Sequence, residues 1–258
     1  MQLEGKIMSG HSKWSTIKRK KEANDARRGS LFTRLARELS IAAREGGGDS
    51  ESNFALRLAM DRARMANMPK DNIERAIRRG TGEDKEGTTF EQVIYEAFAP
   101  HGVALLIEVV TDNRNRSVAE LRHHVTKFGG NLAEAGAVSW QFKRMAYFAV
   151  PAPGLDQDKL FEAVVEAGAE DVIIGPEDVE IQAPVAAFKA ISDRLKAMGI
   201  KPTEVSLRMM PSSLVTLSPG DTLQVMRMVE ALEEADDVQA VYSNLDVTEE
   251  AVALIEPA

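Results

Sequence analysis

The sequence predicts an α+β protein with three domains: an N-terminal helical bundle followed by two α/β domains, one ferredoxin-like and inserted in the other. Three observations support this class. Apolar residues recur at helical spacing as far as Gly80. A polar segment follows at residues 81–89, and beyond it strand and helix patterns alternate. The expected domains cover residues 8–82, residues 90–142 together with 211–246, and residues 143–210.

The first helix of the bundle is expected over residues 29–45. Leu31, Leu35 and Leu39 share one face at i, i+4 spacing, and arginines gather on the opposite face. Those arginines are Arg34, Arg37 and Arg44. Three glycines, Gly46-Gly47-Gly48, should end the helix, because glycine accepts the left-handed conformation of a C-terminal cap.

Two further helices complete the bundle. One starts at a capping side chain after the glycines and runs to about Met65. The candidate caps are Asp49, Ser50 and Ser52. The other opens at Pro69, where the missing N–H of proline costs nothing, and it is expected to end at Gly80. The arginines that face outward on it are Arg75, Arg78 and Arg79.

The rest of the chain divides into three groups of elements. The first group has strands at 92–98 and 103–111, a helix at 116–128 and a strand near 138–142. The second group follows the β-α-β-β-α-β order of a ferredoxin-like unit, at 145–150, 156–167, 172–174, 179–182, 185–198 and 204–209. The third has a strand at 214–217, a helix at 221–235 and a strand at 238–243. Since the first and third groups are each incomplete, we expect them to form one domain that the second group interrupts.

Charge is divided unevenly along the chain. Residues 8–82 carry seventeen Lys and Arg against nine Asp and Glu, a balance of +8, whereas residues 83–258 carry fourteen against thirty, a balance of −16. The overall charge of −8 hides this division. A local positive field attracts polyanions whatever the net charge, so the first domain is predicted to bind nucleic acid. The acidic remainder would limit indiscriminate binding.

The composition also argues against several classes of protein. The chain has no cysteine, which removes disulfides, thiolate zinc sites and a cysteine nucleophile and fits a reducing cytoplasm. Its best apolar run, residues 103–107, is far shorter than the roughly 18 residues of a membrane span. Residues 1–7 lack the apolar core of a secretory signal, and Met8 is a candidate natural initiator. We therefore expect a cytoplasmic protein without a membrane partner.

The predicted nucleic-acid contacts fall on a basic N-terminal arm and on the arginine faces of two helices. The arm residues are Lys13, Trp14, Lys18, Arg19, Lys20, Lys21, Arg27 and Arg28, and the helix residues are Arg34, Arg37, Arg75, Arg78 and Arg79. Cations of this kind neutralise phosphates, and on duplex DNA the log–log salt slope changes by about −0.9 per phosphate. The alternative for each helix face is a solvated surface with local ion pairs. Trp14 could stack on an unpaired base or anchor the arm to the bundle, and both interpretations stay open.

The segment at residues 111–117 lies where a strand passes into a helix. Asp112 or Asn113 can cap that helix, and Arg114 and Arg116 near free backbone N–H groups could hold an anion. Arginines in such a segment more often tie structural elements together. For Asn113, Arg114 and Arg116 we therefore favour a structural turn over an anion site.

Motifs for catalysis or metal binding are missing from the sequence. His123 and His124 are adjacent, so they do not converge as an i, i+4 metal pair would. His11 and His101 have no partner by spacing, and no phosphate-binding glycine loop or nucleophile elbow occurs. The acidic run at residues 233–237 lacks the alternating oxygen ligands of a calcium loop and is predicted to be a solvated helix end. We expect no metal, no cofactor and no enzymatic activity.

The sequence resembles the YebC family in motifs spread from Met8 to Ser243. The matching segments are G-H-S-K-W at residues 10–14, D-A-R-R-G at 25–29, G-G-G-D at 46–49, A-N-M-P-K-D-N-I-E-R-A-I at 66–77, T-D-N-R-N-R at 111–116 and G-G-N-L at 129–132. The resemblance implies a helical N-terminal domain and two α/β domains, the last inserted within the second. It also implies nucleic-acid-linked control of gene expression without known catalysis. Bacterial relatives are described as DNA-binding probable transcriptional regulators, the mitochondrial relative activates translation of cytochrome c oxidase subunit I, and some bacterial members look like ribosome-acting factors.

The sequence therefore predicts a non-enzymatic, monomeric regulator of gene expression that binds DNA or ribosomal RNA, with the ribosome as a candidate partner. A transcriptional regulator needs base readout, for which no recognisable helix-turn-helix is present. A ribosome-associated factor needs mainly backbone and loop contacts on RNA, which a basic arm with Trp14 supplies. Alternatives from other classes are an enzyme with its anion site at residues 111–117 and a protein scaffold.

Overall fold

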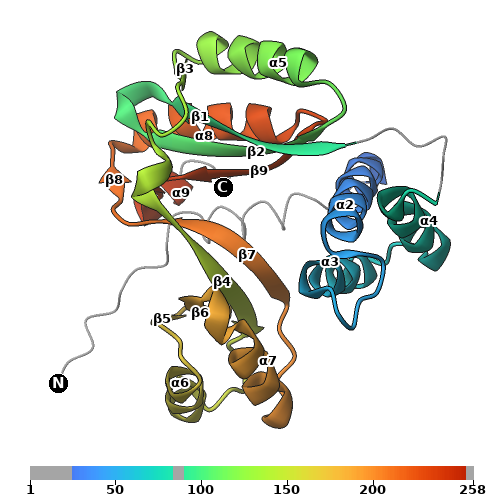
Figure 1. Ribbon diagram of the computed structural model, residues 1–258. Coiled ribbons are helices and arrows are strands. Elements are labelled where there is room, and N and C mark those ends of the chain that lie inside the picture. Colours follow the sequence, from blue (N-terminus) through green and yellow to red (C-terminus); the bar gives the residue numbers. More distant parts are fainter. Residues whose placement is uncertain (1–24, 84–89, 254–258) are drawn as a thin grey trace.

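The computed structural model describes residues 25–83 and 90–253, and it confirms the α+β class (Figure 1). A helical region comes first in the chain, and two four-stranded antiparallel sheets with their helices follow. Among the residues so described, no helix is long and apolar enough to cross a membrane.

Within the described part of the chain, three helices form the bundle: α2 (Asp25–Gly46), α3 (Phe54–Met65) and α4 (Lys70–Thr81). One core joins them, and its almost wholly buried members include Leu39, Leu56 and Ile73, one from each helix. The bundle therefore buries the apolar faces that the helical spacing predicted.

The cap predicted for α3 is wrong. Asn53, rather than Asp49, Ser50 or Ser52, caps this helix, because its Oδ1 accepts the backbone N–H of Leu56 at 3.0 Å. Its Nδ2 also donates to the carbonyls of Ala42 and Gly47, at 2.7 and 2.8 Å. One buried amide thus ends α2 and starts α3.

The predicted end of α4 at Gly80 is also wrong. The helix passes through Gly80 and ends before Gly82, which takes the left-handed conformation at φ 78°. Gly80 lies where α2 and α4 cross, and a Cβ there would be 2.3 Å from the carbonyl oxygen of Ser40. The glycine therefore permits close approach of two helices.

The first sheet has the order β3-β1-β2-β9. Its strands are β1 (Glu91–Phe98), β2 (Ala104–Thr111), β3 (Asn131–Ala133) and β9 (Val238–Ser243). The helices α5 (Arg114–Lys127) and α8 (Pro219–Glu233) share a core with one face of the sheet. Leu106 of β2 belongs to a second cluster on the other face, so β2 is buried on both sides, and this explains its continuous apolar run.

The second sheet has the ferredoxin-like order β5-β6-β4-β7. Its strands are β4 (Phe142–Pro151), β5 (Asp171–Ile174), β6 (Asp178–Pro184) and β7 (Glu204–Pro211). The helices α6 (Gln157–Glu166) and α7 (Phe188–Ala197) pack on it, with the short helix η3 (Val185–Ala187) before α7. Along the chain this sheet lies between β3 and β9 of the first sheet. The residue limits proposed for the individual domains stay predictions.

Two predicted strands have different places in the structure. The segment near residues 138–142 is the short helix η2 (Ser139–Gln141), and β4 begins directly after it. The buried carboxylate of Glu96 accepts backbone N–H groups of Gly136, Val138 and Ser139 at 2.7, 2.6 and 3.0 Å, which holds this segment in a turn.

The strand expected at 214–217 is likewise not part of the first sheet. It is reduced to β8 (Val215–Thr216), which pairs in parallel with β10 (Leu245–Asp246), ahead of the terminal helix α9 (Glu249–Ala253). The short helix η1 (Pro100–Gly102) takes the place of the turn between β1 and β2.

Candidate nucleic-acid interface

Most of the predicted arm lies outside the described residues. This applies to Lys13, Trp14, Lys18, Arg19, Lys20 and Lys21, and the side chains of Arg27 and Arg28 also lie outside what the structure describes. The assignment of these residues to nucleic-acid binding stays a prediction.

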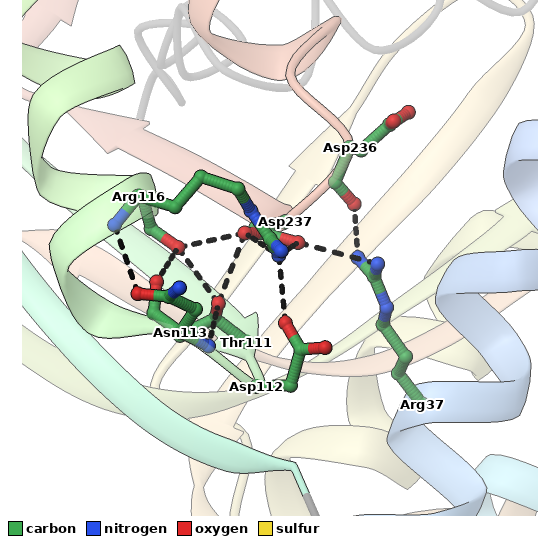
Figure 2. A network of polar contacts seen from close by, with 8 residues as sticks. Arg37, Thr111, Asp112, Asn113, Arg116, Asp236 and Asp237 are labelled. Carbon is green, nitrogen blue, oxygen red and sulfur yellow. Dashed lines mark hydrogen bonds and ion pairs between the residues drawn. The ribbon is translucent and has the colours of Figure 1, made fainter. Parts of the chain in front are cut away.

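The arginines of α2 that were expected to face outward contact another part of the chain. Arg34 Nη2 donates to the carbonyl of Glu233, and Arg37 Nη1 donates to the carbonyl of Asp236. Arg37 Nη2 also lies 3.2 Å from Asp237 Oδ1 (Figure 2). The last carbonyls of a helix lack partners within it and carry partial negative charge, so Arg34 satisfies the C-terminal end of α8, and Arg37 binds a carbonyl of the turn that follows. Both guanidinium groups hold the bundle against the first sheet.

Asp237 is the centre of this contact, and its side chain is only 4% exposed. Its carboxylate accepts hydrogen bonds from Ser117 Oγ at 2.7 Å, Thr111 Oγ1 at 3.0 Å and Arg116 Nη2 at 2.9 Å. Figure 2 shows it between the guanidinium groups of Arg37 and Arg116. Burial by itself would raise the pKa of this carboxyl, but the hydrogen bonds from Ser117, Arg116 and Thr111 hold the pKa below its usual value. Asp237 is therefore a buried, ionised group that joins α2, α5 and the start of β9.

The acidic run at residues 233–237 was predicted to be a solvated helix end, and this is wrong for its last member. Asp236 and Glu234 are exposed, as expected, but Asp237 is buried. The arginines that explain this difference, Arg37 and Arg116, lie far earlier in the chain, so the local pattern of the run could not include them.

The turn at residues 111–117 is built from the same network. Asn113 caps α5, because its Oδ1 accepts the N–H of Arg116 at 3.1 Å. Arg114 Nε lies 2.6 Å from Glu91 Oε1, and Arg116 Nη2 lies 2.7 Å from Asp112 Oδ1. Both arginines thus have carboxylates of the chain as partners, which favours the structural turn over the anion site.

Two arginines of α4, Arg75 and Arg79, line a groove between α2 and α4 that has a volume of about 330 Å³. Arg75 and Arg78 are exposed, and Arg79 is half-buried with an Nε that has no hydrogen-bond partner among the described residues. The guanidinium of Arg37 lies 5.4 Å from the ring centre of Phe90 at the same groove. The residues that line it are Phe32, Thr33, Ala36, Arg37, Met68, Asn72, Arg75, Ala76, Arg79 and Phe90. Of the predicted helix cations, Arg75, Arg78 and Arg79 have no ion pair with any residue that the structure describes.

A second charged network was not predicted from the sequence, and it lies where the bundle and both sheets meet. Arg62 of α3 donates to Glu38 of α2 at 2.6 Å. Arg208 of β7 lies over the ring of Tyr147, 3.7 Å from its centre, and pairs with Glu204. The Arg–aromatic geometry is that of a cation–π contact, which is stronger when partly desolvated.

Tyr242 of β9 extends this network into the first sheet. Its hydroxyl donates to Glu108 Oε2 at 3.4 Å, and burial raises the pKa of both groups. The fields of Arg144 and Arg62 oppose that rise at Glu108. In the sequence, this network is indicated only by Glu108 within the apolar run of β2 and by Arg208 within β7. Neither residue identifies its partner.

Of the four histidines, His101, His123 and His124 lie in the described part of the chain, and His11 lies outside it. His101 takes a positive φ of 64°, and its Nε2 lies 3.4 Å from Asp221 Oδ1 and 3.3 Å from Gln224 Oε1, partners that sequence spacing did not reveal. In the parts of the chain that the structure describes, no group of three or more His, Asp or Glu side chains could hold a metal ion.

Sequence comparison matches nearly the whole chain to two domain models. Residues 12–83 match the TACO1/YebC protein N-terminal domain, and residues 90–245 match the TACO1/YebC second and third domain. The two matches meet at the polar segment where the sequence changes from helical to α/β patterns.

Individual relatives agree with these matches. Probable transcriptional regulatory proteins from Acidithiobacillus ferrooxidans and Rubrobacter xylanophilus are 49% and 48% identical, and the alignments cover 96% and 95% of this chain and 99% and 98% of theirs. A crystal structure of a conserved hypothetical protein from Aquifex aeolicus has 43% identity and a TM-score of 0.79, over 86% of this chain and 91% of that one.

Proposed function

The chain belongs to the TACO1/YebC family, and on this premise we propose that it regulates gene expression by binding nucleic acid through its helical domain. Its curated relatives carry the name probable transcriptional regulatory protein, which supports a regulatory role. The observation that carries the proposal is the charge division, with +8 over residues 8–82 and −16 over residues 83–258. Cytoplasmic location and a monomeric state belong to the same proposal.

The contacts of the described arginines restrict where a phosphate backbone would lie. Arg34 and Arg37 are engaged with the end of α8 and the turn that follows it, so they contribute to holding the bundle in place. Arg75 and Arg78 project from α4 into solvent. We therefore place the phosphate contacts on the arm residues Lys18–Lys21 together with the outer face of α4.

The same pairing supports a non-enzymatic role. The turn arginines, which were the best candidates for a substrate anion, have Glu91, Asp112 and Asp237 as partners. An active site would need a nucleophile, a base and an orienting group around a free position. We propose that this network positions domains.

One observation favours duplex DNA as the target. The helices α3 and α4 are joined by only four residues, 66–69, and Asn67 among them takes the left-handed conformation at φ 58°. A short turn of this kind is a feature of helix-turn-helix units, whose second helix enters the major groove. The helix α4 would then lie in the major groove, with Arg75 and Arg78 on the phosphates that border it. The competing target is RNA, which the basic arm with Trp14 favours.

Replacing Lys18, Arg19, Lys20 and Lys21 by alanine tests the proposed binding. Affinity for a nucleic acid should fall, and the log–log salt slope should flatten by about 0.9 for each duplex phosphate that the variant no longer neutralises. A control variant removes the same number of charges from the α/β part of the chain, at Lys127, Lys143, Lys159 and Lys189. Unchanged affinity and slope in the arm variant would show that the arm is not the binding element.

Crosslinking in cells followed by sequencing of the attached nucleic acid separates the two targets. Reads confined to ribosomal RNA would contradict the DNA regulator, and discrete promoter peaks would contradict the ribosome-associated factor. A protein partner that survives nuclease and high salt, with no attached nucleic acid, would instead support a scaffold.

A further inference from the structure

A cleft of about 580 Å³ separates α3 from the unit formed by α7 and β7. Figure 1 shows α3 beside these two elements, with the bundle on one side and the second sheet on the other. The apolar lining includes Phe54, Leu58 and Met65 of α3, and across from them Phe188, Ile200 and Val205. A pocket of this volume is in the range that small-molecule ligands occupy.

Large apolar side chains remain open at this cleft. Phe54 is 39% exposed and Met65 is 43% exposed. The ring of Phe54 meets that of Phe188 edge to face, with ring centres 4.8 Å apart. Phe188 in turn lies 5.0 Å from Phe148, which is wholly buried, so the aromatic floor is fixed to the core of the second sheet. The aromatic side chains of the cleft are therefore held in place by contacts with the core of the second sheet.

Cations border the apolar lining on both walls. Arg57 and Arg64 come from α3, and Lys196 and Lys201 come from the opposite wall. Arg57 donates to backbone carbonyls, and Arg64 lies 3.1 Å from Asp61. Lys196 and Lys201 are exposed and make no hydrogen bond or ion pair with any residue that the structure describes.

The lining carries four cations, Arg57, Arg64, Lys196 and Lys201, against the single carboxylate of Asp61, so its net charge is positive and attracts anions. The positive wall formed by Lys196 and Lys201 is notable because residues 83–258 carry an overall balance of −16. A ligand that fits this site combines an apolar group with an adjacent negative charge. A nucleotide has both in one unit, because its base is planar and its phosphate is anionic.

We propose that this cleft binds an unpaired nucleotide of a single-stranded nucleic acid, and the inference rests on the proposed nucleic-acid-binding function. The base lies on the surface of Phe54 and Met65, and the flanking phosphates bind Lys196 and Lys201. Aromatic stacking combined with a cationic groove is the usual design of single-strand sites. An acidic amphipathic peptide is the other class of occupant, and its binding is one of the outcomes of the test below. The cleft therefore adds single-strand recognition to the contacts of the arm and α4.

The test compares a single-stranded twelve-nucleotide uridine homopolymer with a twelve-base-pair duplex, at one salt concentration, on the full-length chain. In the cleft variant Lys196→Gln is combined with Lys201→Gln, and a second variant carries Met65→Glu. Both should bind the single strand about tenfold more weakly, the effect of losing roughly one stacked base or its phosphate contacts. Duplex affinity should change less than twofold. The matched control combines Lys159→Gln with Lys189→Gln, which removes two lysine charges from the same region outside the cleft.

The outcomes separate this inference from the function on which it rests. Unchanged single-strand affinity in both variants, with duplex binding retained, would overturn the cleft site and leave the proposed function standing. Equal losses on strand and duplex would overturn it too, because the cleft would then contribute only general charge. If the unmodified chain bound neither probe, the proposed function and the cleft site would both be wrong. If an acidic amphipathic peptide bound the cleft more tightly than the single strand and displaced it, the cleft would be a peptide site instead. Unfolding midpoints close to that of the unmodified chain confirm that the variants are folded.

Discussion

Replacing Asp237 by asparagine removes the negative charge to which α2 and α5 are both bound. The substitution preserves the shape of the side chain and leaves the guanidinium groups of Arg37 and Arg116 without a carboxylate at this position. Ser117 and Thr111 can still donate to the remaining carbonyl oxygen, since both hydrogen bonds come from hydroxyl groups. The perturbation therefore tests the charge more than the packing.

The exposure of each partner sets the size of the effect. Breaking a buried ion pair by removing one partner costs about 3–5 kcal/mol, and Arg37 and Asp237 are 13% and 4% exposed. Arg116 is 51% exposed and adds little, because solvent screens such a pair. With the hydroxyl hydrogen bonds retained, we expect a loss at the lower end, about 3 kcal/mol. In urea this lowers the unfolding midpoint by about 1–2 M for a slope near 2 kcal/mol/M.

The pH dependence of that loss gives a second, independent readout. The pKa of Asp237 is held below its usual value in the folded chain, so the unfolded chain binds more protons as the solution becomes acidic. Its stabilisation is present above the unfolded pKa of about 3.9 and is lost as the pH falls through the lower folded pKa. The difference in free energy of unfolding between the unmodified chain and Asp237→Asn should therefore be largest at pH 7 and should shrink below about pH 4.

Asp236→Asn is the matched control, because the side chain of Asp236 is exposed and only its backbone carbonyl meets Arg37. It should change the free energy of unfolding by less than about 0.5 kcal/mol. Equal losses for the two substitutions, or a loss at Asp237 that is the same at pH 3 and pH 7, would refute the assignment of a buried ionised centre.

Two further substitutions test local features of the fold. Glu96→Gln should cost about 1.5–3 kcal/mol, because one amide oxygen cannot replace a carboxylate that accepts three backbone N–H groups. The emission of Trp140, which is 75% exposed on the segment that Glu96 holds, should also change; unchanged emission and stability would contradict this anchoring. Gly80→Ala should destabilise by about 1–3 kcal/mol in thermal or urea unfolding, since the new Cβ meets the Ser40 carbonyl, whereas Gly220→Ala has open space and should stabilise α8 by up to about 1 kcal/mol. If alanine stabilised the protein at both glycines, helix propensity rather than the close approach of α2 and α4 would decide the effect.

Local patterns were sufficient for most of the fold. The apolar face of α2 and the proline before α4 predicted the bundle, and the apolar run in β2 predicted a strand. The strand β3 has only three residues, Asn131–Ala133, and it exists because it pairs with residues 96–98 of β1. A segment this short carries no periodicity, so the sequence could not show it.

The candidate site was less accessible to such reasoning. Arg34 and Arg37 occupy the polar side of an amphipathic helix, which usually faces solvent. Here that side meets the end of α8, across a separation of 199 residues. Contacts over that distance depend on how the domains dock, and no local spacing encodes them. The assignment of the arm and of α4 to nucleic-acid binding stays a prediction.

The strands β4 and β7 connect the two sheets, and they run side by side over eight residue pairs, from Phe142 opposite Pro211 to Ala149 opposite Glu204. A further hydrogen bond, from the Ser212 N–H to the Gln141 carbonyl at 2.7 Å, extends the pairing to the point where the chain enters and leaves. The two chain segments that join the sheets are therefore one hydrogen-bonded pair of strands rather than two separate linkers. A single strand can swivel about its own bonds, but a paired ribbon bends and resists torsion. One wall of the cleft is formed by α7 and β7. A force applied there is transmitted through this strand pair to the hydrophobic cluster in which Met209 packs with Tyr242 of the first sheet.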